Sequence, residues 1–532
     1  MAKHEKELLA VPMRDVTSAG EVYSGIARLA GRLWCARHRA NPGRNAEVAV
    51  LVMHPSSNFL GHYALDAWAD RGVDAIAMTT RYLGNDSTLL LENCVVDVGT
   101  VIAHLRDVEG YEKVVLIGNS GGGGLSALYQ EQAEKPTITS SPCGGGPDLT
   151  RAELSPADAL VMLMAHPGRA NLLTEWLDPA VGTDEDPLAA DPFNRNPELD
   201  MFEEGNGPSY DAEWLERYRS AQRARGDAIT DWVVERLAEV DRRSGGRAGD
   251  IPFTVQATCA DPRFLDLRID PSDRERGTLW GDAYTANLQP STLGHHTSLR
   301  SWLSQWSLRT SHGNGPDRLT RVSVPVHVIY GTGDQGCFPS HARELYDAVP
   351  HARKELTAIR GGKHYLNGQT ELTEEMAEHL VGWSIGSSSG RRLSDPKPHV
   401  EGAAAQPLPF PHEVNSSLYV PRRRVPMMVA NGPSRVPVIR RQSGRCIGDL
   451  DPDAAARLAD RTRGSKATGH AARATMSGPR AASRFRRVPT PATSSSTRSP
   501  GSSCRSSSTP EPKPTVPEPM TSPGSRSSPS ET

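Results

Sequence analysis

The stretch YEKVVLIGNSGGGGLSALYQEQAE, residues 111–134, sets one serine among glycines between two regular elements. The continuous apolar run at 114–117 is typical of a buried strand, and helical periodicity follows the glycines. The pattern Gly118-x-Ser120-x-Gly122 lies between them. In this context it matches a nucleophile elbow, in which a sharp strand-to-helix turn exposes the serine hydroxyl. The neighbours must be small because the strand and the helix pass close together there. Ser120 is therefore the candidate nucleophile.

The glycines allow two other interpretations. A bare G-x-S-x-G match is common in a glycine-rich chain, and glycines ahead of a helix can also bind phosphate. However, the chain has no G-x-x-x-x-G-K-[ST] motif, and the stretch lacks the Rossmann spacing with its acidic residue about 20 positions later. The strand–turn–helix context favours catalysis.

A serine hydroxyl needs a base to act as a nucleophile, and an acid to orient that base. Asp334 follows a predicted strand in VPVHVIYGTGDQGCFP, and His364 follows the next one in LTAIRGGKHYLNG. Either residue alone is equally typical of a surface turn. Together with Ser120 they occur in the order Ser, acid, His, each after a strand. Asp334 is expected to hold the tautomer of His364, which takes the Ser120 proton and later returns it.

An oxyanion hole requires two hydrogen-bond donors. The N–H of Gly121, at the positive end of the predicted helix, is the first. The second is expected from the loop MHPSSNFLGH, residues 53–62. Pro55 has no N–H, so Ser56 or Ser57 should donate. His54 is interpreted as a packing residue beneath the loop.

Strand and helix patterns alternate through the first 168 residues, which predicts βαβ units and an α/β fold with a mostly parallel central sheet covered by helices on both faces. Residues 20–41 favour two strands around Gly31. The predicted parts are the N-terminal part of the core (1–168), a cap or lid insertion (169–319), the C-terminal part of the core (320–386) and a tail (387–532).

The insertion contains helical patterns at 211–243 and 293–311. Its aromatic residues are expected mainly to form the core of the cap, and alternatively to line a substrate pocket: Trp214, Tyr218, Trp232, Trp280, Trp302 and Trp306. His166, His295 and His296 are interpreted as loop or packing residues. Four aspartates at 261, 266, 270 and 273 alternate with arginines, so ion pairs are favoured over a cation site.

The tail differs sharply in composition from the rest of the chain. It is rich in Ser and Pro, and residues 391–532 hold 23 Lys and Arg against 10 Asp and Glu, whereas the preceding residues are acidic. Such a segment cannot bury enough apolar surface to fold, so it is predicted to be disordered. It lacks the aromatic and zinc patterns of nucleic-acid binding, and no nucleic-acid partner is expected. A frameshift or fused extension is a further hypothesis.

Seven scattered cysteines without a CxxC pair, no leader-like start and no long apolar run predict a cytoplasmic protein that does not span a membrane.

The motifs HPSS (54–57), GNSGG (118–122), GTGD (331–334) and GGKH (361–364) resemble those of the α/β-hydrolase superfamily, in the broad group of esterases and lipases with a cap. The resemblance covers about residues 20–385 and implies an eight-stranded sheet and a Ser-His-Asp enzyme without metal or organic cofactor. The expected activity is hydrolysis of small to medium hydrophobic or aromatic carboxylic esters through an acyl-enzyme. A thioesterase, a C–C hydrolase, an acyltransferase and a noncatalytic binding protein on the same scaffold stay open, as does the oligomeric state.

Overall fold

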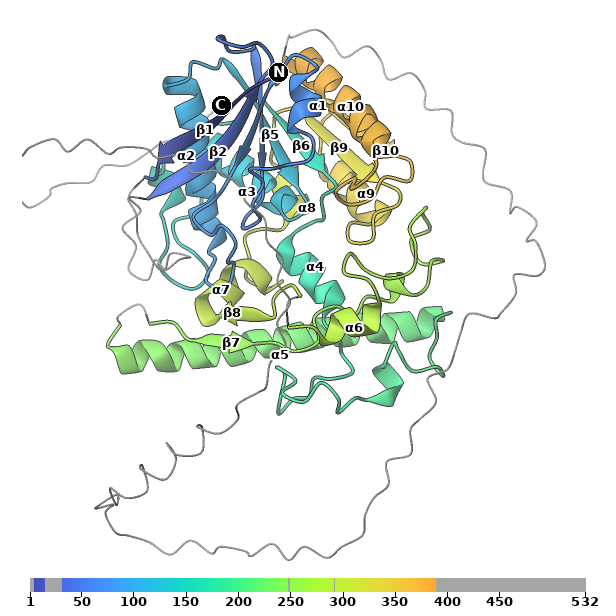
Figure 1. The fold of residues 1–532 in the computed structure, drawn as a ribbon. Coiled ribbons are helices and arrows are strands. Elements are labelled where there is room, and N and C mark those ends of the chain that lie inside the picture. The colour runs from blue at the N-terminus through green and yellow to red at the C-terminus, as the bar shows by residue number, and fades with distance from the viewer. Residues whose placement is uncertain (1–3, 15–30, 247–248, 291, 389–532) are drawn as a thin grey trace, which may run out of the picture. The chain divides into compact units, whose positions relative to one another are not determined.

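The computed structural model describes residues 4–14, 31–246, 249–290 and 292–388, all within the unit Met1–His412 (Figure 1). The tail predicted at 387–532 lies outside the described residues from residue 389 onward. So do residues 20–30 of the predicted strand pair.

Eight strands form the central sheet in the order β1-β2-β4-β3-β5-β6-β9-β10. β1 and β2 are antiparallel, β2 and β4 are antiparallel, and every later pair is parallel. The mostly parallel sheet and its strand number agree with the prediction. The strands are β1 (Glu5–Pro12), β2 (Arg32–Arg39), β3 (Val48–Met53), β4 (Asp74–Met78), β5 (Lys113–Asn119), β6 (Ala159–Leu163), β9 (Val326–Gly331) and β10 (Lys354–Ile359).

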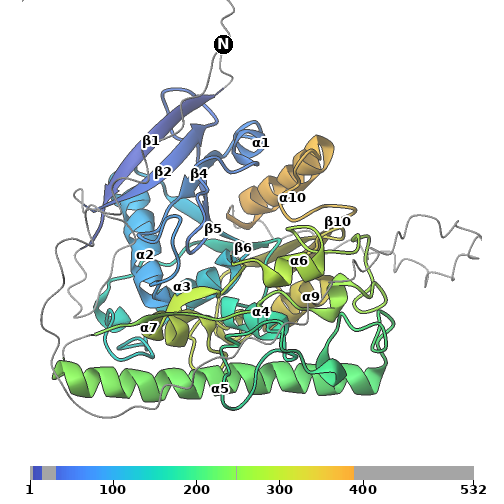
Figure 2. The ribbon, with the colours of Figure 1, turned by 60° about the horizontal axis from the view of Figure 1, so that its bottom comes forward.

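Alternate residues of the central strands supply two separate apolar cores. In β3, Leu51 and Met53 belong to one core, whereas Val50 and Val52 belong to the other. This follows from the period of two along a strand, and a strand buried on both faces reads as a continuous apolar run. Figure 2 shows α1 and α10, which contact each other, on the face of the second core.

Helices cover both faces of the sheet and form much of the insertion between β6 and β9. They are α1 (Leu65–Ala69), α2 (Leu91–Asp107), α3 (Gly122–Glu134), α4 (Arg169–Trp176), α5 (Ala212–Ser244), α6 (Ala283–Leu288), α7 (Leu299–Ser301), α8 (Gly315–Leu319), α9 (Pro339–Ala348) and α10 (Thr370–Ser388). Among the described residues, no helix has the length and apolar character needed to cross a membrane.

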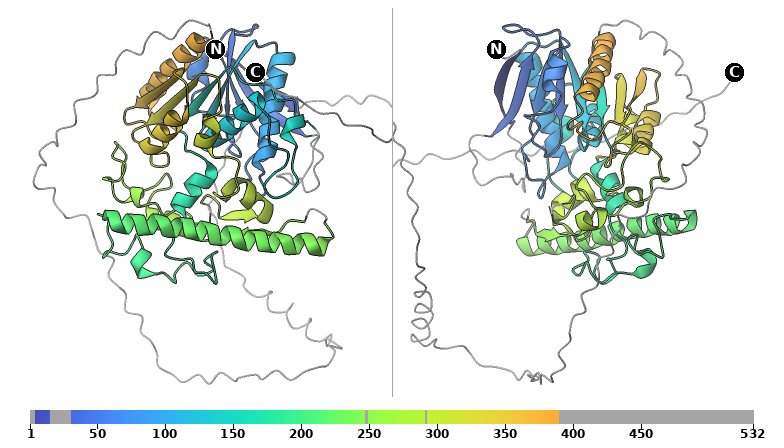
Figure 3. Two further views of the ribbon diagram at one scale, coloured as in Figure 1. Left: turned by 180° about the vertical axis from the view of Figure 1, so that it is seen from behind. Right: turned by 45° about the vertical axis from the view of Figure 1, so that its right-hand side comes forward.

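The insertion between β6 and β9 contains α4 to α8 and a small antiparallel pair, β7 (Pro252–Thr254) and β8 (His296–Ser298). Figures 1 and 3 show the long helix α5 on the side of the cap remote from the central sheet. The prediction of one helix over 293–311 is wrong in part: β8 occupies its start, and α7 and a π-helical turn (Trp302–Trp306) follow. Thr297 lies in β8, and Ser298 ends β8 and caps α7. Such residues favour strands and caps over helix interiors.

Most of the aromatic residues considered in the insertion pack in clusters within it. Trp214 and Tyr218 stack on one another in one cluster, and Trp302 and Trp306 lie in another, with Trp232 packed against it. The aspartate-rich stretch forms ion pairs, Asp261 with Arg263 and Asp266 with Arg268, as the interleaved arginines indicated.

Candidate active site

Ser120 stands at the sharp turn between β5 and α3. Its φ is +56°, a left-handed conformation that is uncommon for a residue with a side chain and typical of a nucleophile elbow. Its N–H donates to the carbonyl of Leu163 at the end of β6, at 3.1 Å. A Cβ on Gly118 would lie 2.4 Å from the carbonyl oxygen of Gly122, and one on Gly122 would lie 2.3 Å from that of Met53. Glycine is therefore required on both sides of the serine.

Asn119 and His62 form hydrogen bonds that hold the turn at Ser120 in place. The sequence analysis did not predict this role for either residue. The Asn119 side chain donates to the Leu163 carbonyl at 2.8 Å, and its Oδ1 lies 3.0 Å from Nε2 of His62. Nδ1 of His62 accepts from the N–H of Ala64, so the proton lies on Nε2. Burial lowers the pKa of His62 to about 4, which keeps this ring neutral.

The structure brings Ser120, His364 and Asp334 into one hydrogen-bonded chain. Oγ of Ser120 lies 2.9 Å from Nε2 of His364, and Nδ1 of His364 lies 2.8 Å from Oδ2 of Asp334. Oδ1 of Asp334 accepts the N–H groups of Gly336 and Cys337 at 2.7 and 2.9 Å. Asp334 is 1% exposed and His364 3% exposed. A carboxylate held by two backbone donors fixes the imidazole with its proton on Nδ1.

The loops that carry Asp334 and His364 approach each other closely at their glycines. A Cβ on Gly331 would lie 2.1 Å from the carbonyl oxygen of Gly362, and the N–H of Gly333 donates to that carbonyl at 3.0 Å. The glycines of GTGD and GGKH therefore let the ends of β9 and β10 approach closely enough for the acid to reach the base.

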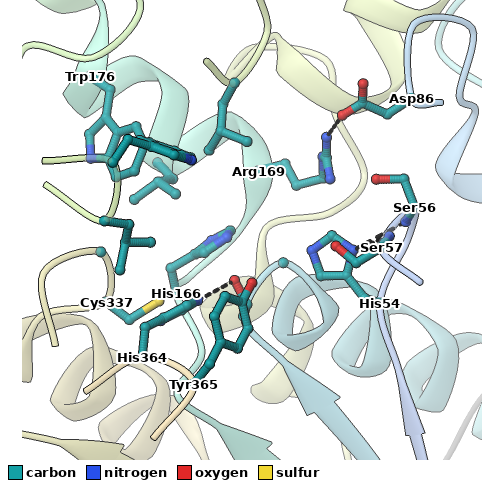
Figure 4. A pocket seen from close by; sticks show the side chains of 17 residues that line it. His54, Ser56, Ser57, Asp86, His166, Arg169, Trp176, Cys337, His364 and Tyr365 are labelled. Atoms are coloured by element: carbon teal, nitrogen blue, oxygen red, sulfur yellow. Dashed lines mark hydrogen bonds and ion pairs between the residues drawn. The ribbon is translucent and has the colours of Figure 1, made fainter. Parts of the chain in front are cut away.

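A cavity of about 190 Å³ opens above Ser120 (Figure 4). Five apolar lining residues come from the insertion: Leu172, Trp176, Leu279, Trp280 and Leu293. Trp176 and Trp280 meet edge to face, with ring centroids 5.7 Å apart. Trp280 is thus the one member of the aromatic set considered in the sequence that lines this cavity, while Trp176 joins it from α4.

Polar residues line the rest of the cavity. Arg169 is 5% exposed; its Nη2 donates to Asp86, and its guanidinium lies 4.2 Å from the ring centroid of Trp306. His166 lies in the loop after β6, as interpreted from the sequence, and also lines the cavity. Burial lowers the pKa of His166 to about 3. His295 and His296 are not among the residues that line this cavity.

In the described part of the chain, one group of side chains has the spacing of a metal site, namely Asp334, Cys337 and His364. Its carboxylate and imidazole are already bonded to each other. Burial raises the pKa of the Cys337 thiol well above its usual value, so the thiolate that a metal would require is disfavoured.

The loop that was expected to supply the second oxyanion donor has another arrangement. The N–H groups of Ser56 and Ser57 both donate to Nδ1 of His54, at 3.1 and 2.9 Å. They are therefore engaged by a side chain of their own loop, which differs from the expectation that one of them is free. Gly121 keeps the expected place at the first turn of α3, where N–H groups lack helical partners.

The strand order, the elbow after β5, the acid after β9 and the histidine after β10 together define an α/β-hydrolase fold. No protein-family model matches the sequence, and no curated protein matches it.

Similar solved structures include several hydrolases. An esterase domain from Rhodothermus marinus is 10% identical, with a TM-score of 0.35 over 71% of this chain and 98% of that chain. The monoacylglycerol lipase of Paleococcus ferrophilus is 13% identical, with a TM-score of 0.34 over 67% and 99%. Est1E from Butyrivibrio proteoclasticus is 13% identical, with a TM-score of 0.34 over 69% and 99%.

Proposed function

We propose that this protein is a serine hydrolase that cleaves carboxylic esters through an acyl-enzyme intermediate. The observation that carries the proposal is the continuous hydrogen-bond chain from Ser120 through His364 to Asp334, at the floor of a cavity. A nucleophile, a base and an orienting acid at these distances are what acyl transfer requires.

In the first half of the reaction, Oγ of Ser120 attacks the ester carbonyl carbon while Nε2 of His364 takes the hydroxyl proton. The carbonyl π pair moves onto the oxygen and forms a tetrahedral oxyanion. Collapse of this intermediate breaks the bond to the alcohol, which leaves with the proton from His364. Asp334 stays ionised throughout and stabilises the imidazolium.

In the second half, a water molecule replaces the alcohol. His364 takes one proton of this water as its oxygen attacks the acyl carbon. The second tetrahedral intermediate releases the carboxylic acid, and the proton returns to Oγ of Ser120.

The lining of the cavity favours a small or medium hydrophobic or aromatic acyl or alcohol group. Leu172, Trp176 and Trp280 offer apolar surface on the cap side, where burial of a ring is favourable. Arg169 and Asp86 form the opposite wall, so substrate groups that accept hydrogen bonds are better placed there.

Labelling with a fluorophosphonate probe tests the proposal on the full chain. The wild-type serine should be labelled, and Ser120→Ala should not be. A panel of p-nitrophenyl esters graded by acyl size should then give turnover with the wild type alone. A folded wild type that neither reacts with the probe nor hydrolyses any ester would contradict the proposal and favour a noncatalytic scaffold.

A further inference from the structure

The hydrogen bonds of the His54 ring fix which of its two nitrogens carries the proton. Its Nδ1 accepts two backbone N–H groups, those of Ser56 and Ser57. A nitrogen that accepts two hydrogen bonds cannot also hold a proton, so the proton of the neutral ring lies on Nε2. The loop sequence thus selects one tautomer of His54.

The ring of His54 is neutral at neutral pH. His54 is 8% exposed, and burial, together with Arg169 and His166, lowers its pKa well below the usual range. A neutral ring with its proton on Nε2 offers one fixed N–H and avoids bringing another charge next to Arg169.

The Nε2 edge of His54 lies beside the nucleophile. It is 2.8 Å from the position that a Cβ on Gly121 would occupy, and Gly121 directly follows Ser120. Within the described residues, this nitrogen has no hydrogen-bond partner, and the ring lines the cavity. Figure 4 shows the bonded edge of the ring toward Ser56 and Ser57 and its other edge toward the cavity.

We propose that Nε2–H of His54 is the second donor of the oxyanion hole, acting together with the backbone N–H of Gly121. The inference rests on the proposed ester hydrolysis. As Ser120 attacks, the carbonyl oxygen gains the π pair and accepts both hydrogen bonds, and no proton is transferred from His54. A donor fixed before the reaction stabilises charge that develops only in the transition state. The side chain thereby fills the role that the loop backbone around Pro55 does not provide.

Two substitutions of His54 separate donation from support of the loop. In His54→Asn, the amide oxygen lies near the position of Nδ1 and can still accept from Ser56 and Ser57, but nothing reaches the position of Nε2. In His54→Gln, the amide nitrogen reaches that position and can donate, whereas the acceptor at Nδ1 is lost. The measurements are kcat and KM for a p-nitrophenyl ester and the thermal unfolding midpoint of each full-length variant.

Loss of one oxyanion donor lowers kcat by about 10²–10³-fold. We expect a loss of this size in His54→Asn with KM changed little, and a loss at least about tenfold smaller in His54→Gln. If His54→Asn keeps kcat within about threefold of the wild type, or if His54→Gln loses as much as His54→Asn, the inference is overturned.

Tyr365 provides the matched control. It lines the same cavity, its hydroxyl faces Ser120, and burial raises its pKa to about 12, so it is also a neutral donor. Tyr365→Phe should lower kcat less than His54→Asn does. The reverse order would assign the second donor to Tyr365. A wild type without esterase activity would contradict the proposed function itself. An active wild type with an equally active His54→Asn would contradict only the role of His54.

Discussion

At the scale of single residues, the elbow depends on two positions where a methyl group does not fit. The Cβ of an alanine at 122 would stand 2.3 Å from a backbone oxygen of β3, which cannot move without displacing the strand. We therefore expect Gly122→Ala to lower the free energy of unfolding by about 1–3 kcal/mol and to abolish labelling of Ser120. Gly382→Ala is the control, because a Cβ there meets nothing within 4 Å in the exposed face of α10. Equal stability and labelling of both variants would contradict this account.

In the proposed mechanism, Asp334 fixes the tautomer of His364. In Asp334→Asn the amide can present its N–H₂ to the ring, and the imidazole then carries its proton on Nε2, facing Ser120. The expected result is a fall in kcat of roughly 10⁴-fold with nearly unchanged stability. Steady-state ester hydrolysis and thermal unfolding of the same preparation measure both quantities. A variant that keeps a tenth or more of the wild-type kcat would show that Asp334 does not orient the base.

The sequence predicted Ser120, Asp334 and His364 because each follows an apolar run that reads as a buried strand, and parallel strands bring such loops to one edge. It did not predict how the loop at 54–57 directs its N–H groups. That depends on the backbone turn and on the ring of His54, neither of which leaves a periodic signal. Trp176 was missed for a related reason, since only the packing of the cap brings it to the cavity.

At the scale of elements, buried strands could be predicted from the sequence, whereas exposed strands could not. β3 and β5 are continuous apolar runs and were found, whereas β1, with most of its side chains partly or fully exposed, was not. The pair β7–β8 was missed as well, because strands of three residues carry too little pattern to be read. Helix α5 was predicted at 211–243 and is found at Ala212–Ser244, since its length and Gly245 at the C-terminal cap give a clear signal.

Arg225 is one of the α5 residues that bind the loops of the insertion. It is 5% exposed, and its guanidinium donates to the carbonyls of Asp178, Gln256 and Ala257 at 2.9, 2.7 and 3.1 Å. Arg225→Met would remove the donor of the Gln256 carbonyl, at a cost of about 1–3 kcal/mol for a buried group that loses its partner. The Ala257 carbonyl would lose one of its two donors and keep the N–H of Asp178, at 3.0 Å. We expect a large loss of stability in denaturant unfolding.

The control for this prediction lies on the same helix. Arg217 and Glu213 form an exposed pair at 3.8 Å, with side chains 60% and 87% exposed. Such pairs contribute little, so Arg217→Met should change the free energy of unfolding by less than about 0.5 kcal/mol. If the two variants are equally stable, Arg225 does not organise the cap.

At the scale of the whole folded unit, buried neutral histidines couple stability to pH. Burial lowers the pKa of His62 to about 4 and those of His166 and His327 to about 3. In the unfolded chain these groups titrate near 6.5. Below that pH the unfolded state binds more protons than the folded state, so stability falls as the pH falls. The free energy of unfolding is therefore unaffected by these histidines above about pH 6.5. It falls progressively as the pH is lowered from there toward their pKa values in the folded state.

Urea unfolding between pH 7.5 and 5 therefore should show a stability that is level at first and then decreases below about pH 6.5. Each histidine contributes a slope of roughly 1.4 kcal/mol per pH unit well below its unfolded pKa. This window lies above the range in which ordinary carboxylates titrate, so the slope there comes mainly from histidines. His327→Gln should make the slope less steep by about one histidine's share, because its Nε2 contact with Thr357, at 2.8 Å, can be kept by an amide. A free energy of unfolding that stays level down to pH 5 would mean that these rings accept protons in the folded state. That result would also contradict the neutral state, with a proton on Nε2, assigned to the buried rings of His54 and His62.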